Sequence, residues 1–252
     1  MLHHPTLQKL EELRLVGMAA ALRDQLDMPD IESLSFEERI GLLVDREATE
    51  RDDRRLKTRL RKAKLRQTAS VEDLDYRSGR GLDKKVILHL SGCDWVRRHQ
   101  NVVITGATGV GKSFVACALA HKACLNGHGA LYHRLPRLVE DIQLSRGDGR
   151  YIKLLKSLSR IEVLVLDDWG LARLTPPQQR DLLELLDDRH TRKSTIVTSQ
   201  LPVEKWHETM ADPTLADAIL DRLVHNAHHI NLKGESMRKR LSDLNDSGHL
   251  PT

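Results

Sequence analysis

The chain contains few cysteines and no apolar run long enough to cross a membrane. Its three cysteines, Cys93, Cys117 and Cys124, include no C-x-x-C pair, so we predict buried thiols rather than a disulfide or a metal site. No stretch approaches the ~20 apolar residues of a membrane span. The first residues, MLHHPTLQKLEEL, contain no basic region followed by an apolar block. We therefore expect a cytoplasmic protein in a reducing compartment.

The remaining composition is that of a globular protein with an excess of positive charge. At 252 residues and 40% apolar content, the chain can bury the core of one large domain, or of one medium domain with an appendage. The net charge of +4 and the sequence pI near 9.0 favour an anionic partner. Because the histidines lack the spacing of a zinc site, we expect structural or surface side chains at His133, His225, His228 and His229.

The most informative segment is an apolar run, residues 102–105, that leads into G-x-x-x-x-G-K-S at 106–113. This pattern is typical of a P-loop, in which glycines leave room for backbone N–H groups to wrap a phosphate chain. Lys112 is expected to reach the β- and γ-phosphates of ATP, and the Ser113 hydroxyl to bind Mg²⁺ at the start of a helix. The predicted nucleotide-binding residues of the loop are Gly106, Ala107, Thr108, Gly109, Val110, Gly111, Lys112 and Ser113.

Two adjacent acids follow a second apolar segment, residues 161–166, which we interpret as a buried strand. Asp167 is predicted to hold Mg²⁺, directly or through water, and Asp168 to orient the attacking water. Many ATPases have glutamate at the second position. Because aspartate is one methylene shorter, the sequence predicts slow hydrolysis.

Residues 1–68 are predicted to form a small all-helical domain that binds DNA or a partner. A first helix is expected to be interrupted at Gly17 and to continue to Leu26. Ser35 and Glu38 match a capping box at the start of a long helix.

The long helix ends in a strongly basic segment. Residues 51–66 hold nine lysines and arginines and two aspartates. Two interpretations stay open: a solvated helix face, or a docking surface for DNA phosphates or an acidic partner. The absence of aromatic residues from this run favours backbone contact over base stacking. The candidate DNA contacts are Arg54, Arg55, Arg59 and Arg61.

The rest of the chain divides into a linker and an α/β domain. Residues 69–84 are polar and contain glycine, which is typical of a linker. From 85 to 252, strand and helix signals alternate, which predicts a parallel five-stranded sheet covered by helices on both faces. The strands are expected at 102–105, 130–133, 161–166, 195–198 and 228–232.

Eight short motifs occur in order along nearly the whole chain: RGLDK at 80–84, GATGVGKS at 106–113, YHRLPRLVEDI at 132–142, GDGRY at 147–151, LVLDDWG at 164–170, TSQLP at 198–202, DAILDRL at 217–223 and LKGESMRKR at 232–240. Apart from the P-loop each is weak alone, but in this order they are specific. They resemble the IstB-like helper ATPases of insertion-sequence transposition. That family lies in the AAA+ initiator and helicase-loader branch, which is related to DnaA and DnaC.

The resemblance implies a three-layer P-loop AAA+ domain and assigns further site residues. Gln200, next to Ser199, matches the sensor-1 place and would contact the γ-phosphate or the lytic water. Arg222 matches the arginine finger, which would reach the γ-phosphate bound by a neighbouring subunit; Arg189 and Arg192 are the next candidates for this role. Arg238 matches the sensor-2 arginine of the subunit's own site. The permanent charge and planar fork of arginine suit both tasks.

The resemblance also implies a helical element between the second and third strands that lines a central channel and contacts DNA. The candidate residues in this element are Arg137, Arg146, Arg150, Tyr151 and Lys153.

The function implied is that of an ATP-dependent transposition regulator. With ATP and Mg²⁺ it would assemble into a homo-oligomeric ring or spiral on duplex DNA, remodel the target site, and recruit and activate a transposase. Hydrolysis would be slow and coupled to assembly.

Three other functions stay open or are disfavoured. A DnaC-like replicative helicase loader shares the fold, although the lack of cysteine before Cys93 excludes the zinc-bearing N-domain of some loaders. A small-molecule P-loop kinase would need a lid with phosphate-clamping arginines and an acceptor pocket, which the sequence does not indicate. A binding module that has lost catalysis stays open because of Asp168.

Overall fold

The computed structural model describes residues 5–76 and 79–237 of the chain. The predicted sensor-2 residue, Arg238, lies outside the described residues. Contacts divide the chain into two compact units, residues 1–58 and residues 59–252. Within the described ranges, no helix is both long enough and apolar enough to cross a membrane.

The first unit consists of helices. They are α1 (Pro5–Glu12), α2 (Val16–Leu26), the 3₁₀ helix η1 (Ile31–Ser33) and the first part of α3 (Phe36–Ala63). The predicted capping box at the start of α3 is confirmed. The backbone N–H of Ser35 donates to the Glu38 carboxylate at 2.8 Å, and the N–H of Glu38 donates to Ser35 Oγ at 3.2 Å.

The predicted helix break at Gly17 is wrong, because Gly17 is the second residue of α2. The break lies earlier, at residues 13–15, where Arg14 has a φ of 60°. Gly17 is required by packing: an added Cβ would lie 2.6 Å from the Cα of Glu47 on α3. The Glu47 carboxylate accepts hydrogen bonds from the N–H groups of Gly17 (2.7 Å) and Met18 (3.2 Å), which caps the N-terminus of α2. Glycine weakens a helix locally, so the sequence alone suggested a break.

The second unit is built on a five-stranded parallel sheet in the order β2-β3-β4-β1-β5. Every predicted strand is confirmed. The strands are β1 (Asn101–Gly106), β2 (Ala130–Arg134), β3 (Val163–Trp169), β4 (Ser194–Ser199) and β5 (Ala227–Leu232). Because helices cover both faces, almost every residue of β1, β3 and β4 is buried.

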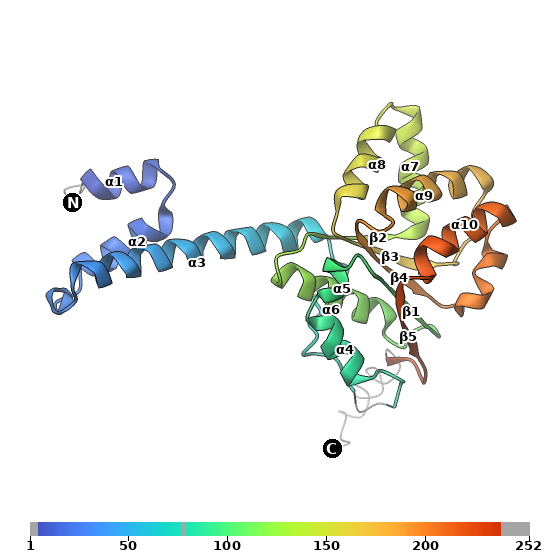
Figure 1. Cartoon of the computed structure of the whole chain (residues 1–252), viewed down its shortest axis with the longest axis horizontal. Helices are drawn as coiled ribbons and strands as arrows, with labels where there is room; N and C mark the ends of the chain where they lie inside the picture. Colours follow the sequence, from blue (N-terminus) through green and yellow to red (C-terminus); the bar gives the residue numbers. More distant parts are fainter. Residues whose placement is uncertain (1–4, 77–78, 238–252) are drawn as a thin grey trace, which may run out of the picture. The chain divides into compact units, whose positions relative to one another are not determined.

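The helices form a layer on each face of the sheet (Figure 1). One layer contains α4 (Lys84–Ser91), α5 (Asp94–Arg97) and α6 (Lys112–Leu125). The other contains α7 (Leu135–Gly147), α8 (Tyr151–Arg160), α9 (Pro176–Arg189) and α10 (Pro213–Val224). Alternate strand residues such as Val103, Leu164 and Val197 face this second layer and share its apolar core. Two 3₁₀ turns, η2 (Val203–Lys205) and η3 (His207–Thr209), precede α10. The three cysteines are free and buried, as predicted.

Residues 69–76 and 79–82, which have the composition of a linker, pack on the α/β unit. Ala69, Val71, Leu74 and Leu82 are buried. The Arg80 carbonyl accepts a hydrogen bond from the N–H of Lys233 at 2.8 Å, immediately after β5. A few apolar side chains within a polar stretch are enough for this packing, and they bring the segment beside the P-loop.

Candidate nucleotide site

The P-loop connects the carboxyl end of β1 to the start of α6, the usual place for a ligand in an open parallel sheet. Lys112 is 9% exposed, and its Nζ donates to the carbonyl oxygens of Gly106 (2.7 Å) and Ala107 (2.8 Å). Burial lowers the pKa of Lys112, although the charges of Asp167 and Asp168 oppose the shift. The ammonium is therefore held inside the loop, where it can meet phosphate oxygens.

Gly111 shows why the loop needs glycine. Its φ is +98°, and an added Cβ would lie 2.8 Å from NH1 of Arg80. Arg80 is buried, and it donates to the carbonyl oxygens of Val110 (3.2 Å) and Asp75 (3.1 Å). The side chain thus supports the loop from outside. Arg80 belongs to the RGLDK motif at 80–84, whose pattern does not by itself indicate a place at the nucleotide site.

Asp167, at the end of β3, has an exposed fraction of 0% and is held by three hydroxyl groups. Ser113 Oγ donates to it and lies 2.9 Å from both carboxylate oxygens. Tyr132 on β2 and Thr198 on β4 also donate to it. Burial, together with the hydrogen bond to Asp167, raises the pKa of Tyr132, so this hydroxyl keeps its proton. A hydroxyl and a carboxylate side by side form the hard oxygen donor set that suits Mg²⁺.

Asp168 and Gln200 lie on the same cavity as the P-loop. The cavity has a volume of about 360 Å³, within the range of small-molecule sites, and Thr108, Gly109, Gly111, Lys112 and Ser113 also line it. Asp168 has a φ of 66°, and its carboxylate accepts a 2.7 Å hydrogen bond from Arg134. Gln200 Oε1 accepts a 2.8 Å hydrogen bond from Thr108 Oγ1. The fold thus brings the acid and the amide to the nucleotide loop.

The cavity also has lining residues that no sequence motif predicted at the site. They are Arg66, Gln67, Asp73, Asp75, Arg80, Phe114 and Met237. Most belong to the polar stretch after α3, whose composition carries no nucleotide-binding signal.

Comparison with known proteins identifies the family. A family model described as "IstB-like ATP binding protein" matches residues 8–244. The chain belongs to the IstB-like ATP-binding protein family. It is 54% identical over 239 residues to "Putative insertion sequence ATP-binding protein y4pL" of Sinorhizobium fredii, covering 95% of this chain and 98% of that protein. It is 32% identical over 229 residues to "Insertion sequence IS21 putative ATP-binding protein" of Pseudomonas aeruginosa, covering 91% and 86%.

Solved structures agree with the family at the level of the fold. DnaI covers 66% of this chain, with a TM-score of 0.55 and 20% identity over 91% of its own chain. AMPPCP-bound DnaA from Aquifex aeolicus covers 74% of this chain, with a TM-score of 0.57 and 16% identity over 57% of its own chain. The predicted family, the α/β P-loop AAA+ fold and the P-loop ATPase class are therefore confirmed.

In this IstB-like chain Arg222 lies away from the nucleotide cavity. It is in the last turn of α10, beside the start of β1, whereas the P-loop follows the end of β1. Its guanidinium donates to the Asp187 carboxylate and to the Ala218 carbonyl at 3.0 Å. It is not among the described residues that line the cavity.

Arg189 cannot replace Arg222 as an interface arginine, because its side chain is enclosed. It is 1% exposed, and its guanidinium donates to the carbonyls of Leu158 (2.8 Å), Ile161 (2.7 Å) and Ser194 and to Thr195 Oγ1 (3.2 Å). Burial lowers the pKa of Arg189 to about 9. Its role is to join α9 to the sheet.

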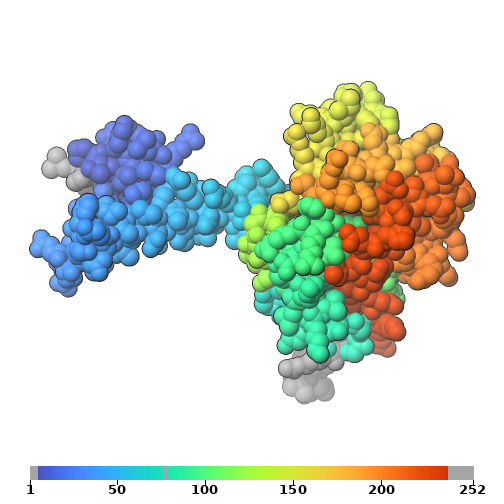
Figure 2. Space-filling view, in the orientation of Figure 1, coloured from blue at the N-terminus to red at the C-terminus, as the bar shows by residue number. Residues whose placement is uncertain are grey.

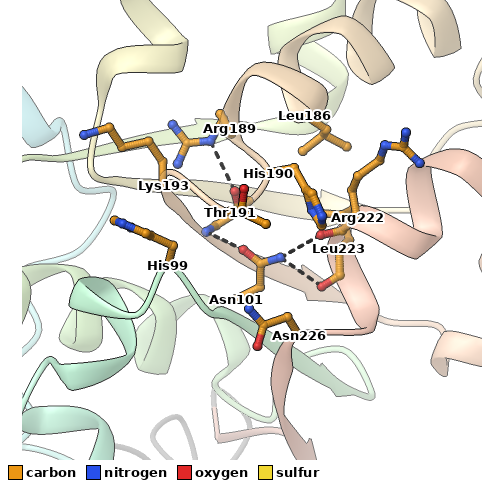
Figure 3. A pocket seen from close by; sticks show the side chains of 11 residues that line it. His99, Asn101, Leu186, Arg189, His190, Thr191, Lys193, Arg222, Leu223 and Asn226 are labelled. Carbon is orange, nitrogen blue, oxygen red and sulfur yellow. Dashed lines mark hydrogen bonds between the residues drawn. The ribbon is translucent and has the colours of Figure 1, made fainter.

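Asn101 fixes the helix end that carries Arg222 (Figure 3). Its Nδ2 donates to the carbonyls of Arg222 (2.9 Å) and Leu223 (3.1 Å), and its Oδ1 accepts from the N–H of Thr195 (2.9 Å). The residue is 7% exposed. This amide therefore ties α10 to β1 and β4.

We expect Asn101→Ala to lower the free energy of unfolding by about 2 to 4 kcal/mol, because it leaves buried carbonyl and N–H groups without partners. Urea denaturation followed by circular dichroism measures this. Ser194→Ala is the control, since its hydroxyl donates a single hydrogen bond, to the Trp95 carbonyl at 3.3 Å, and we expect a loss of about 1 kcal/mol. Equal losses in the two variants would contradict the role assigned to Asn101.

The predicted channel-lining element is the pair α7 and α8, which projects from the α/β unit (Figures 1 and 2). Arg137 and Lys153 are exposed. Arg146 donates to Asp181 and stacks on Tyr151, 3.8 Å from the ring centroid, and Arg150 donates to Asp148. The Tyr151 hydroxyl lies 2.7 Å from Glu184 Oε2. Arg146, Arg150 and Tyr151 therefore have partners within the chain that a DNA phosphate would have to displace or share.

The four candidate DNA contacts of α3 have different surroundings. Arg54, Arg55 and Arg61 are exposed. Arg54 lies 3.9 Å from Glu50 and Arg55 lies 3.3 Å from Asp52, ion pairs that are worth little at a surface. The Nε of Arg59 donates to the Cys124 carbonyl at 3.0 Å. Replacement of Arg59 would therefore disturb packing as well as charge.

Proposed function

We propose that this chain is an ATP-dependent regulator of transposition that assembles on duplex DNA, remodels the target site, and recruits and activates a transposase. The observation that carries the proposal is the family match over residues 8–244, because relatives covering most of this chain are described as insertion-sequence ATP-binding proteins. ATP binding would control assembly, and duplex DNA would be the surface on which the subunits assemble.

The position of Arg222 supports assembly of several subunits. Arg222 lies beside the start of β1, away from its own P-loop, so its predicted role requires a phosphate bound by an adjacent copy, which would replace its ion pair with Asp187. ATP bound between two subunits stabilises the assembled state to the extent that it binds that state more tightly than the separate subunits. Hydrolysis removes that preference and favours disassembly.

The site supports a conventional hydrolytic arrangement. Ser113 and Asp167 would hold Mg²⁺, which would supply positive charge to neutralise the phosphates. Asp168 would orient the attacking water while Gln200 contacts that water or the terminal phosphate. Because Asp168 is short and its carboxylate also accepts a hydrogen bond from Arg134, we propose slow hydrolysis.

The exposed arginines of α3 provide the test with DNA. We expect the triple variant Arg54→Gln, Arg55→Gln, Arg61→Gln to weaken duplex binding, because it removes three predicted phosphate contacts. The steepness of log K against log salt should decrease by about 0.9 per lost contact, about 2.7 in all. Fluorescence anisotropy with a labelled duplex at several salt concentrations, with ATP present, measures both quantities.

A second triple variant controls for net charge alone. It replaces Arg97, Arg98 and Arg180, which are exposed and lie outside α3, with glutamine. If both variants lower the slope equally, α3 is not the DNA-binding segment. A parallel titration with single-stranded DNA separates the proposal from a helicase loader, which would prefer the single strand.

A further inference from the structure

The nucleotide cavity has a wall that the P-loop motifs do not account for. It comes from the polar stretch after α3 and contains Arg66, Gln67, Asp73, Asp75 and Arg80. Three cations line the cavity among its described residues: Arg66, Arg80 and Lys112. Arg80 and Lys112 donate to backbone carbonyls of the loop region, as described above. Arg66 has different surroundings.

Arg66 lies beside the predicted metal-binding pair, Ser113 and Asp167. Its NH1 is 3.8 Å from Oδ2 of Asp167, the carboxylate that also accepts from Ser113 Oγ. The guanidinium also interacts with the Tyr132 hydroxyl, and this contact, together with the nearby carboxylates, raises the pKa of Arg66. A cation beside the predicted metal-binding pair is placed to meet the oxygens of the β- and γ-phosphates.

The backbone of Arg66 is anchored, whereas its side chain stays accessible. The Cys117 thiol on α6 contacts the backbone of Arg66 and Gln67, which holds the segment against the helix that begins with Lys112. The Arg66 side chain is 43% exposed, although the Asp167 carboxylate beside it is fully buried. Because the backbone of Arg66 is held in place, its accessible guanidinium would lose little conformational freedom on contact with a phosphate. This combination suits a phosphate-binding arginine.

We propose that Arg66 is a nucleotide-binding residue whose guanidinium contacts the terminal phosphate of the ATP held by the P-loop of its own subunit. The proposal rests on ATP binding by the family and is independent of DNA and of Arg222. ATP presents one phosphate more than ADP, so a contact at this end distinguishes the two nucleotides. Arg66 lies three residues after the end of α3, so this contact would also make the junction with the basic helix sensitive to the bound nucleotide.

Calorimetric titration of the full chain with AMPPCP and with ADP, in Mg²⁺ and at concentrations where sedimentation detects no assembly, tests this proposal. We expect Arg66→Ala to weaken AMPPCP binding by about tenfold or more, the range of a charge-assisted hydrogen bond, and to change ADP binding less than about twofold. Arg66→Lys keeps the charge without the planar fork, so we expect an intermediate loss.

Two controls make the result specific. Lys64→Ala removes an exposed cation of the same segment that does not line the cavity, and it should bind both nucleotides as the unmodified chain does. Lys112→Ala should lose affinity for both nucleotides. Melting curves of all variants show whether each one folds.

A repeat in EDTA distinguishes direct contact from an effect through Asp167. If Arg66 binds the phosphate itself, the selective loss of AMPPCP affinity persists without Mg²⁺. If the selectivity disappears in EDTA, Arg66 only positions the metal-binding carboxylate, and the proposal is overturned. Equal losses for AMPPCP and ADP, or no loss for either in folded variants, would also overturn it. None of these outcomes bears on transposition or on assembly.

Discussion

Lys112→Ala is expected to weaken nucleotide binding by about 10- to 100-fold and to abolish ATP-driven assembly. The substitution removes the main side-chain charge within the P-loop, where Nζ now lies 2.7 Å and 2.8 Å from the carbonyl oxygens of Gly106 and Ala107. Sedimentation with and without ATP measures assembly, and calorimetric titration measures binding.

Lys122→Ala is the matched control for this experiment. Lys122 is on the same helix, α6, but its ammonium pairs with Glu72 at 3.2 Å and does not line the nucleotide cavity. We expect this variant to assemble with ATP as the unmodified chain does. An ATP-induced shift that survives in Lys112→Ala would show that assembly does not depend on the P-loop.

Arg222→Ala is expected to leave nucleotide binding by the unassembled subunit nearly intact while it lowers hydrolysis by about 10³-fold or more, the contribution of an arginine supplied in trans. The two binding measurements should therefore separate the variants, since Lys112→Ala loses affinity and Arg222→Ala does not. Steady-state phosphate release measures the loss of hydrolysis.

Mixing the two variants tests whether the site is shared between subunits. The Arg222→Ala subunit retains an intact P-loop, and the Lys112→Ala subunit retains an intact arginine, so one complete site can form across an interface. We expect partial recovery of phosphate release in the mixture and none in either protein alone. If Arg222→Ala alone hydrolyses ATP at the unmodified rate, the trans-acting residue is a different one. Arg192, which is exposed, would then be the next candidate, because Arg189 is enclosed.

The sequence predicts those site residues that follow one another in a short segment of the chain. The glycines, Lys112 and Ser113 of the P-loop follow one another within residues 106–113, so their spacing alone indicates a phosphate-binding loop. The acids Asp167 and Asp168 directly follow an apolar segment, and buried parallel strands have such runs. The five strands and the parallel sheet followed from the same alternation of local patterns.

Local patterns did not reveal close contacts between distant segments. Gly17 suggested a helix break, but packing on Glu47 keeps it inside α2. The resemblance makes Arg146 and Tyr151 candidate DNA contacts, which stays a prediction, but the sequence did not indicate that Asp181 on α9 accepts hydrogen bonds from both. In each case the partner is about 30 residues away in the sequence, and only the packed helices bring the two side chains together.

The residues around Asp167 depend most on tertiary structure. Tyr132 and Thr198 reach its carboxylate because β2 and β4 lie on either side of β3, an order that no spacing in the chain encodes. Arg66 reaches the same carboxylate because a polar stretch with a few apolar anchors packs beside α6. A short motif can specify a phosphate-binding loop because one continuous stretch of backbone forms the loop. Side chains from separate strands meet only where the sheet places them, so the surroundings of the metal-binding acid were decided by the fold.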